Sequence, residues 1–568
     1  MATKSYWQQF QQTRFSRRRV LAVTGTSAAG LAIAAACGND KKKDGTPGPT
    51  SGPSAGTPKA GGTYKTAITG DWGSINPLTS VSFGPGILSK MYNALVFQSP
   101  VDPTLFYMDL ASKVEQPEDD DSTYIFTLRP DVMIAPNTLG VPERALDSSD
   151  CVAWLDAIGA ADTAVAKSFT DEWLDSYSAD SPTTFTIKTK GPYAYFFFRL
   201  NSPLGGMIPP KEMLEMDMAS QGVGAGPYVL EDGSFVETGG ANLNANLNYY
   251  RKDETNGDAQ LPYISRLEVS RISDRQPRRT AFIGGQIDSY DPETKAEVDE
   301  LSGQMSGLQV FESPAYTFIG VTMNPTKPPW DNPLVRRAMN YALNRQEYVD
   351  VVVQGAGQIN GLVHWPLKGY ALDPAELEQL QPFDPAMSRQ LIQDAGFDIP
   401  LSVKFIWPAN SDIEFHSKHL PIWLEQMDAA GFAIVPDPQD FGVWLQNYTD
   451  INYDASFSLN QIYEIPEVNL DFHTTQGPTH DGSYAIGIGQ LYPEVDEAVA
   501  ASKSSIDAAA QVELVKDAQR LIYSKDPAFL PIMSWTDYTV RPAKVKNFPR
   551  DVGTGMDLYL STYAWLDV

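Results

Sequence analysis

The stretch YIFTLRPDV, residues 124–132, gives the first firm indication of the fold. Its first five residues alternate in side-chain character as a strand with one buried face does. Residues 184–188, TFTIK, show the same alternation. We therefore expect both segments to be half-buried β-strands.

Helical segments accompany the strands. Asn332 and Pro333 precede LVRRAMNYALNRQEYVDVVV, residues 334–353. Asn332 can accept hydrogen bonds from the free N–H groups at a helix start, and Pro333 has no N–H to leave unpaired there. Apolar residues recur at helical spacing through the segment, and Gly355 follows it, which predicts a helix over this stretch.

A second helical region lies nearer the C-terminus. Residues 493–524 predict two helices joined near 504–507. Strands and helices are mixed along the whole chain, without a regular βαβ rhythm or an internal repeat. This mixture predicts α/β lobes between which the chain crosses.

The first sixty residues differ from the rest. A basic cluster precedes an apolar run at 20–36 that is shorter than the about 20 residues of a membrane span and is diluted by glycine and hydroxyl residues, the layout of a secretory leader. SRRRVL, residues 16–21, resembles a twin-arginine export signal with Val20 in place of the usual Phe. AAAC, residues 34–37, resembles a bacterial lipobox with Ala34 in place of the usual Leu and Cys37 as the acylated residue.

The alternative for this region is a buried Ala-rich helix at the start of the fold. Residues 39–60 argue against it, because they consist mainly of Lys, Asp, Gly, Thr, Pro and Ser with no large apolar side chain. Such a composition suits a flexible tether. We expect residues 1–36 to be a twin-arginine-type lipoprotein signal peptide, and residues 37–60 to be a lipidated cysteine and disordered stalk.

Composition excludes some functions. Loss of the leader removes five basic residues and no acidic one, which leaves 38 basic against 70 acidic residues and a net charge of −32. This charge repels nucleic acid and anionic lipid, so a nucleic-acid partner is excluded. About 500 folded residues exceed one ordinary core, which predicts two or three domains. Outside the leader and stalk only Cys151 remains, so no internal disulfide can form, and its helix-like surroundings predict a packed thiol.

Several segments resemble one family, in order along the chain. They are GGTY at 61–64, SINP at 74–77, YNALV at 92–96, YIFTLRPDV at 124–132, VGAGPY at 223–228, GGQID at 284–288, VRRAMNYALNR at 335–345, residues 386–396 and DPAFLP at 526–531. This series resembles the extracytoplasmic solute-binding proteins of ABC importers, family 5, the peptide/nickel type that includes oligopeptide- and dipeptide-binding proteins. Ala225 and Asn344 depart from the family's usual Thr and Asp.

The resemblance implies an α/β, two-lobed fold of the periplasmic-binding-protein type II kind with an extra inserted subdomain. The implied divisions are lobe I at 61–98, 200–316 and 535–568, the inserted subdomain at 99–199, and lobe II at 317–534. The lobes would close on a solute and the closed form would dock on a membrane permease.

The resemblance also implies which loops line the cleft. Aromatic walls with a few polar groups suit solute recognition, although each aromatic residue could equally be core. The candidate ligand-binding residues are Trp72, Phe83, Trp407, Asn460, Tyr463, Glu464 and Trp535.

One position in these loops bears on the ligand. Classical peptide receptors of the family carry an acidic residue just before the tyrosine, which pairs with the ligand's α-ammonium group. Ile462 occupies that position here. A buried ammonium without a carboxylate is penalised. Unless Glu464 takes over this role, a glycoside, a modified peptide or another small solute fits this position as well as an ordinary peptide does.

Other motifs have structural explanations. Glycines at 222–226 resemble a dinucleotide loop, but the strand-like PYVL follows instead of a helix, which favours a structural turn. His416 and His419 could share a helix face, yet a metal site needs three or four ligands, and a solvated face is the simpler interpretation. No nucleophile elbow or H-E-x-x-H motif occurs in the folded body, so no catalytic residues, metal or cofactor are predicted.

We therefore expect a monomeric receptor subunit of an ABC importer, outside the cytoplasm, in the periplasm or on the outer face of the cytoplasmic membrane. It would be anchored through Cys37, bind a peptide or other small solute, and deliver it to the permease subunits. A secreted hydrolase using the same cleft and a sensory solute receptor are the alternatives.

Overall fold

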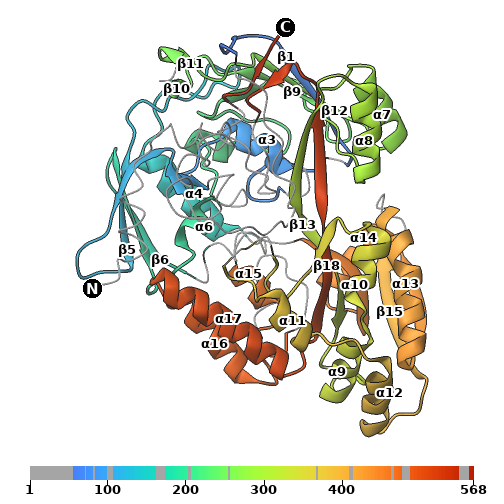
Figure 1. Ribbon diagram of the computed structural model, residues 1–568. Coiled ribbons are helices and arrows are strands. Elements are labelled where there is room, and N and C mark those ends of the chain that lie inside the picture. Colours follow the sequence, from blue (N-terminus) through green and yellow to red (C-terminus); the bar gives the residue numbers. More distant parts are fainter. Residues whose placement is uncertain are drawn as a thin grey trace, which may run out of the picture.

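The computed structural model describes residues 56–70, 72–80, 84–98, 106–161, 170, 173–201, 206–253, 256–365, 367, 369–408, 414–461, 466–475, 487–548 and 562–568. The predicted leader, Cys37 and most of the stalk lie outside these residues. Two lobes and an inserted subdomain, each built on its own sheet, make up the described part (Figure 1).

The upper lobe contains a four-stranded sheet in the order β1-β12-β9-β8. Its strands are β1 (Thr63–Ile68), β12 (Arg266–Arg271), β9 (Ala241–Ala245) and β8 (Tyr228–Leu230). The first pair is parallel and the other two pairs are antiparallel. The helices of this lobe are α3 (Gly84–Met91), α7 (Arg275–Ile283) and α8 (Lys295–Gln304), with the 3-10 helix η2 (Lys211–Glu215) nearby. Three two-stranded ribbons complete it: β2 (Val96–Gln98) with β3 (Phe106–Met108), β10 (Lys252–Asp253) with β11 (Ala259–Gln260), and β19 (Val545–Lys546) with β20 (Trp565–Leu566).

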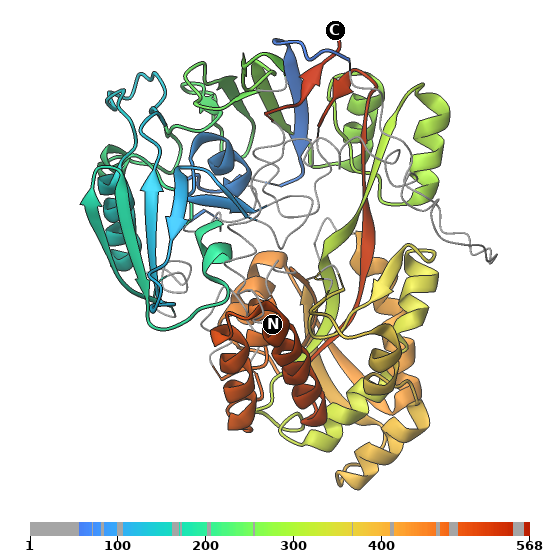
Figure 2. The ribbon, with the colours of Figure 1, turned by 60° about the vertical axis from the view of Figure 1, so that its left-hand side comes forward.

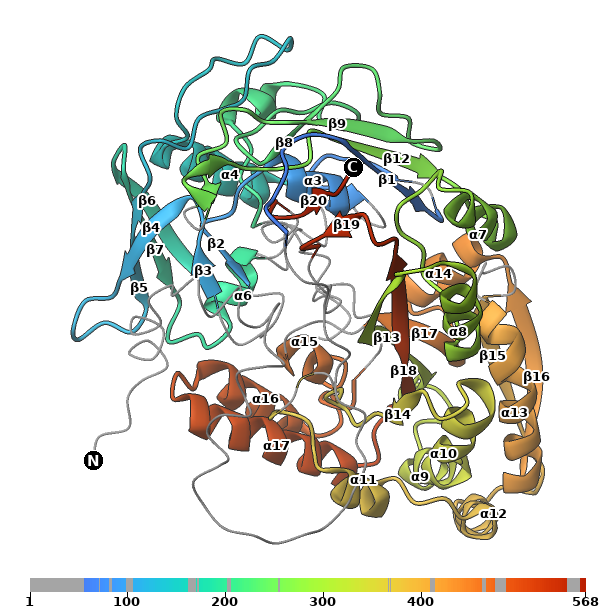
Figure 3. The same cartoon turned by 45° about the horizontal axis from the view of Figure 1, so that its top comes forward.

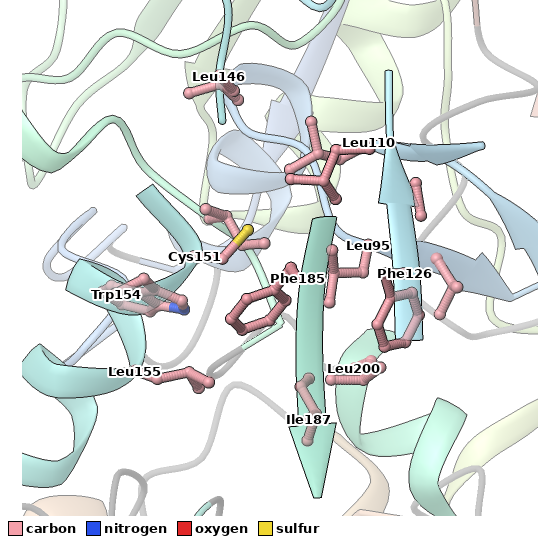
Figure 4. Close-up of a cluster of buried hydrophobic side chains, with 14 of the residues drawn as sticks. Leu95, Leu110, Phe126, Leu146, Cys151, Trp154, Leu155, Phe185, Ile187 and Leu200 are labelled. Atoms are coloured by element: carbon pink, nitrogen blue, oxygen red, sulfur yellow. The ribbon is translucent and has the colours of Figure 1, made fainter. Parts of the chain in front are cut away.

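The inserted subdomain is an antiparallel sheet in the order β4-β5-β7-β6, seen at the left of Figure 2. Its elements are β4 (Ala111–Glu115), β5 (Thr123–Leu128), β6 (Leu174–Ser181), β7 (Thr184–Thr189), α4 (Ser148–Ala160) and α6 (Phe196–Asn201). Strands β5 and β7 bury every second side chain, as predicted from the alternation. Cys151 packs among apolar side chains from α4 and this sheet (Figure 4), which confirms its predicted role as a buried thiol.

The lower lobe contains a six-stranded sheet in the order β14-β18-β13-β17-β15-β16. Its strands are β13 (Gln309–Met323), β14 (Gly357–Ile359), β15 (Leu401–Pro408), β16 (Phe432–Gln439), β17 (Ala455–Gln461) and β18 (Phe529–Arg541). Besides α9 and α10, which are described below, its helices include α11 (Pro374–Leu380), α12 (Pro385–Asp394), α13 (Glu414–Ala430), α14 (Phe441–Thr449), α15 (Pro466–Asp471), α16 (Pro493–Ser504) and α17 (Ala508–Ser524). Two helices over 493–524, joined at 505–507, confirm the prediction for that stretch.

Strands β13 and β18 run from the upper lobe into the lower one (Figure 1). They pair with each other over both lobes, and the register shifts between Pro314 and Phe318 and again between Ile319 and Gly320. A register shift locally increases twist and weakens the ladder. This irregular segment lies where the sequence predicts the chain to pass between lobes.

The predicted helix after Asn332 is interrupted. Asn332 does accept a hydrogen bond from Leu334 N, but α9 (Pro333–Ala342) ends before Leu343, whose backbone is extended. Asn344 then acts as a second cap, accepting from Glu347 N, and α10 (Arg345–Glu347) and the π-helical η4 (Tyr348–Val352) follow. Apolar periodicity alone did not reveal this break, because Asn344 can sit inside a helix or cap a new one.

The glycines at 222–226 form a structural turn, as predicted. A Cβ on Gly224 would lie 2.2 Å from the carbonyl oxygen of Met91, and one on Gly226 would lie 2.5 Å from that of Lys90. Only glycine allows this close approach to the end of α3. Strand β8 follows directly, so the segment does not open a helix as a phosphate-binding loop would.

Candidate functional site

A cavity of about 400 Å³ lies beside the paired strands β13 and β18. Residues 291–294 line it from the upper lobe, Ser313 and 535–539 from the strands themselves, and Lys418 with Val352, Val353 and Ala356 from the lower lobe. We call it the crossover cavity. Its size falls within the usual range for a small-solute site.

The crossover cavity combines one large aromatic side chain with several carboxylates. Trp535 is half-buried, and its Nε1 donates to Asp537 Oδ1 at 2.9 Å. Thr539 Oγ1 donates to Asp291 Oδ1 at 2.8 Å. Glu293 forms ion pairs with Arg275 of the upper lobe at 3.0 Å and with Lys418 of the lower lobe at 3.9 Å. Such a wall can stack on an apolar face of a solute and accept hydrogen bonds from its N–H or O–H groups.

The inserted subdomain contacts the lower lobe through a buried cluster of charged and polar side chains. Tyr193 OH donates to Glu467 Oε1 at 2.7 Å, and Arg199 Nε donates to Tyr193 OH at 3.1 Å. Lys503 Nζ lies 3.6 Å from the same Glu467 oxygen and 2.9 Å from Asp471 Oδ1. The side chains of Glu467, Asp471 and Arg199 are exposed by 0%, 3% and 5%. We call these five residues the ionic junction.

Backbone and apolar contacts extend the ionic junction. Ala194 N donates to Lys503 O at 2.8 Å, across the same boundary. Val468 of α15 belongs to the hydrophobic cluster of the inserted subdomain and is 1% exposed. In Figures 1 and 3, α6 accordingly lies next to α15 and α16.

Two buried histidines lie near the lower end of β13. His364 packs on Phe318 with ring centroids 4.0 Å apart, and His473 packs on Phe529 at 5.9 Å. Burial lowers the pKa of His473 to about 3, and burial together with the charge of His473 lowers that of His364 to about 3. Both are therefore neutral at physiological pH. Within the described ranges, no group of three or more His, Cys, Asp and Glu residues is arranged to hold a metal ion.

The structure corrects one interpretation of a histidine. His419, assigned to a solvated helix face, is 0% exposed on α13 and stacks on Tyr348 with centroids 5.7 Å apart. His419 shares the buried face of α13 with Trp423, Met427 and Ala430, whereas the neighbouring Lys418 is exposed. The side chain of His416 lies outside the described part.

The predicted ligand-binding residues fall in different places. Trp535 lines the crossover cavity. Trp72 is 3% exposed in the upper-lobe core, tilted against Phe235 at 6.5 Å, and Trp407 is 6% exposed in the lower-lobe core, edge-on to Trp423 at 6.4 Å. The backbone of Asn460 pairs with Phe318 in the β13–β17 ladder. The side chain of Asn460, and Phe83, Tyr463 and Glu464 entirely, lie outside the described residues.

Sequence analysis did not select the residues of the ionic junction. Glu467 and Tyr193 are 274 positions apart in the sequence, and nothing local marks either as part of a contact between lobes. An acidic residue in the first turn of a helix is ordinary, and the burial of all six residues of α15 is known only from the structure, so the sequence offers no signal for Glu467.

The profile of the bacterial extracellular solute-binding proteins, family 5 (middle region), matches residues 106–481. The chain is 31% identical over 219 residues to a glutathione-binding protein, GsiB, of Salmonella choleraesuis, covering 38% of this chain and 40% of the relative. It is 28% identical over 282 residues to the GsiB protein of Salmonella paratyphi A, covering 49% of this chain and 51% of the relative. The match thus spans no more than about half the length of these relatives.

A solved structure shows the same fold over nearly the whole chain. The periplasmic binding protein DppA of Helicobacter pylori, associated with an ABC transporter and in complex with the peptide STSA, superposes with a TM-score of 0.75 at 18% identity. The superposition covers 90% of this chain and 99% of that protein. The predicted α/β, two-lobed type II fold is confirmed.

The chain belongs to the bacterial extracellular solute-binding proteins of family 5. In the described part, no helix is both long and apolar enough to cross a membrane.

Proposed function

We propose that this family 5 protein is the solute-binding receptor subunit of an ABC importer, which captures a small solute between its lobes and delivers it to a membrane permease. The observation that carries the proposal is the crossover cavity, which is lined by both lobes and by the two strands that connect them. A solute in such a cavity contacts both lobes at once only when they are closed. Binding then shifts the population toward the closed form without covalent chemistry.

We propose the hinge at the register shifts in the β13–β18 ladder. The sequence predicts lobe boundaries at 316/317 and 534/535. The first lies within the register shift between Pro314 and Phe318 of β13, and the second lies next to Ser534, the residue of β18 that pairs with Phe318. A weakened ladder can absorb backbone rotation while the regular pairing on either side stays intact.

The proposed solute is a peptide or a solute of similar size. The relatives named above are glutathione-binding proteins, and the DppA structure contains a four-residue peptide. Trp535 is the proposed contact for an apolar face of the solute, and Asp537 and Asp291 are proposed acceptors for its donor groups. Trp72, Phe83, Trp407, Asn460, Tyr463 and Glu464 stay candidate ligand residues by analogy with the family.

The proposed location is extracytoplasmic, with the folded body tethered by the stalk to a lipid on Cys37 after twin-arginine export, as a monomer. The described chain begins beside its own C-terminus: Lys59 Nζ lies 2.7 Å from Asp567 Oδ1. The stalk therefore joins the upper lobe, and the lower lobe is free to move relative to the tether. Metabolic labelling with a palmitate analogue tests the anchor, because a Cys37→Ser protein should lose the label.

Native mass spectrometry of the chain from Gly61 onward, gently purified, tests the receptor proposal. We expect a defined adduct that is released on denaturation and whose mass gives the solute class. An adduct with a free α-amino group would overturn the inference drawn from Ile462. If neither an adduct nor a thermal shift with glutathione, dipeptides or glycosides is found, and a substrate is turned over instead, the receptor proposal is wrong.

A further inference from the structure

The ionic junction has no role in the solute contacts proposed above, yet it is among the most deeply buried charge clusters of the described chain. We propose that the junction is the closing contact of the receptor: Arg199 and Tyr193 meet Glu467 and Lys503 when the lobes close, and separate when they open. The proposal rests on the proposed function, since it assumes that the lobes move.

The connectivity requires the junction to separate on opening. Arg199 and Tyr193 belong to the inserted subdomain, which is attached to the upper lobe through chain segments on either side of it. Glu467, Asp471 and Lys503 belong to the lower lobe, which the strands β13 and β18 join to the upper one. Among the described strands, none pairs across the junction. A rotation at the β13–β18 register shifts therefore moves its two sides apart.

The chemistry suits a contact that forms and dissolves. Among the five junction residues, the positive charge of Arg199 from the inserted subdomain meets the net negative charge of Glu467, Asp471 and Lys503 from the lower lobe, so their charges balance while the side chains are almost completely buried. In the open form the same groups regain water, which compensates most of the lost pairing. An apolar surface of equal size would instead be exposed on opening and would hold the lobes shut or promote aggregation. An ionic contact therefore costs less free energy to open than an apolar contact of equal size would.

The hydrogen bonds of the junction also fix the position of the lower lobe in the closed form. Tyr193 OH is held by Arg199 and points its hydrogen at a single oxygen of Glu467, so the pairing tolerates little displacement. Glu467 follows Glu464, a candidate ligand residue, by three positions. Arg199, Tyr193 and Glu467 are thus positioning residues, which fix the start of α15 in the closed form without touching the solute.

Hydrogen exchange of the solute-free protein tests the proposal. Glu467→Gln keeps the shape but leaves the two cations without their shared anion. We expect the amide of Ala194, which donates across the junction, and the amides of residues 467–475 to exchange about 10- to 100-fold faster in this variant. The amides of β5 and β7, inside the inserted subdomain, should keep their wild-type rates.

A matched control separates opening from simple damage. Asp150 is also fully buried and accepts two hydrogen bonds from Arg144, but it lies on α4 inside the inserted subdomain and is not part of the junction. Asp150→Asn should lower stability without selectively speeding exchange at Ala194. Tyr193→Phe, which removes one hydroxyl, should give the Glu467→Gln pattern with a smaller amplitude if the stronger variant fails to fold.

Two results would overturn the proposal. Unchanged exchange at Ala194 and 467–475 in both junction variants would mean that the junction does not control opening. Equal acceleration in β5 and β7 would mean that the junction is a permanent part of the subdomain core. Neither result depends on a solute, so an adduct found by mass spectrometry would still support the receptor function.

Discussion

The crossover cavity and the ionic junction, two contacts of the lower lobe with the rest of the described chain, differ in solvent exposure. At the crossover cavity, Asp291, Glu293, Asp537 and Lys418 are exposed, and Trp535 is only half-buried. At the ionic junction, charges of both signs are almost completely buried. The exposed cavity has room for a solute, whereas the buried junction is filled by the protein's own side chains.

This difference separates two tasks of a closing receptor. A solute site must exchange its water for ligand, so its polar groups are left accessible and its charges need not balance. A closing contact must recognise only the other half of the same chain, so its charges can be matched in advance. We therefore expect substitutions in the junction to change stability and opening, and substitutions in the cavity to change affinity.

The largest expected effect is at the junction. Glu467→Gln leaves Arg199 and Lys503 with reduced compensation in a dry environment, and removal of one partner from a buried ion pair costs about 3–5 kcal/mol. The free energy of unfolding, measured in urea, should fall by about this amount. A change below about 1 kcal/mol would show that the junction is hydrated in solution, and the contrast between the two sites would be lost.

A pair of tryptophans sharpens the comparison. Trp407→Ala removes a buried ring from the lower-lobe core and should lower the free energy of unfolding by about 3 kcal/mol or more. Trp535→Ala removes a half-exposed ring and should cost less than about 1.5 kcal/mol while weakening solute affinity about tenfold or more. Thermal unfolding and calorimetric titration of both variants with the solute found by mass spectrometry decide the matter. Equal stability losses would assign Trp535 to the core.

The buried histidines predict acid sensitivity. Imidazoles of the unfolded chain titrate near about 6.5, whereas the pKa values of His364 and His473 in the folded protein are about 3. Between these values the unfolded chain binds protons that the folded chain does not, so their contribution is full above about pH 6.5 and is lost as the pH falls toward 3. The slope is at most about 1.4 kcal/mol per pH unit for each histidine.

Urea unfolding at several pH values between 4 and 7 measures this slope. His364→Leu should flatten it by roughly half, because one titrating group is removed. The same slope in wild type and variant would mean that His364 is protonated or solvated in the folded protein.

The smallest effect is expected at the exposed ion pair that lines the crossover cavity. Lys418 and Glu293 join the two lobes at 3.9 Å, but both are exposed, and exposed pairs contribute about 0–1 kcal/mol. Lys418→Ala should leave the unfolding transition almost unchanged in moderate salt. A loss as large as that of Glu467→Gln would show that burial does not distinguish the two contacts.

The sequence predicted the elements better than their meeting points. Strands β5 and β7, the capping role of Asn332, the paired helices α16 and α17 and the buried Cys151 follow from local patterns of burial and capping, and all are present. The break at Leu343 and the burial of His419 did not follow, since tertiary packing decides both. The junction of Tyr193 with Glu467 depends on the arrangement of three sheets, which a single sequence does not display.

The most direct test of the account is a distance measurement between the inserted subdomain and the lower lobe. Fluorescent labels at Asp175→Cys in β6 and Glu513→Cys in α17, both exposed positions, report on separation at the junction in the chain from Gly61 onward. The account predicts a short distance when the purified solute or saturating glutathione is bound, a minor population at a longer distance after the solute is removed, and a larger such population in solute-free Glu467→Gln. One unchanging distance in all three states would contradict it, because the lobes would then be a rigid unit.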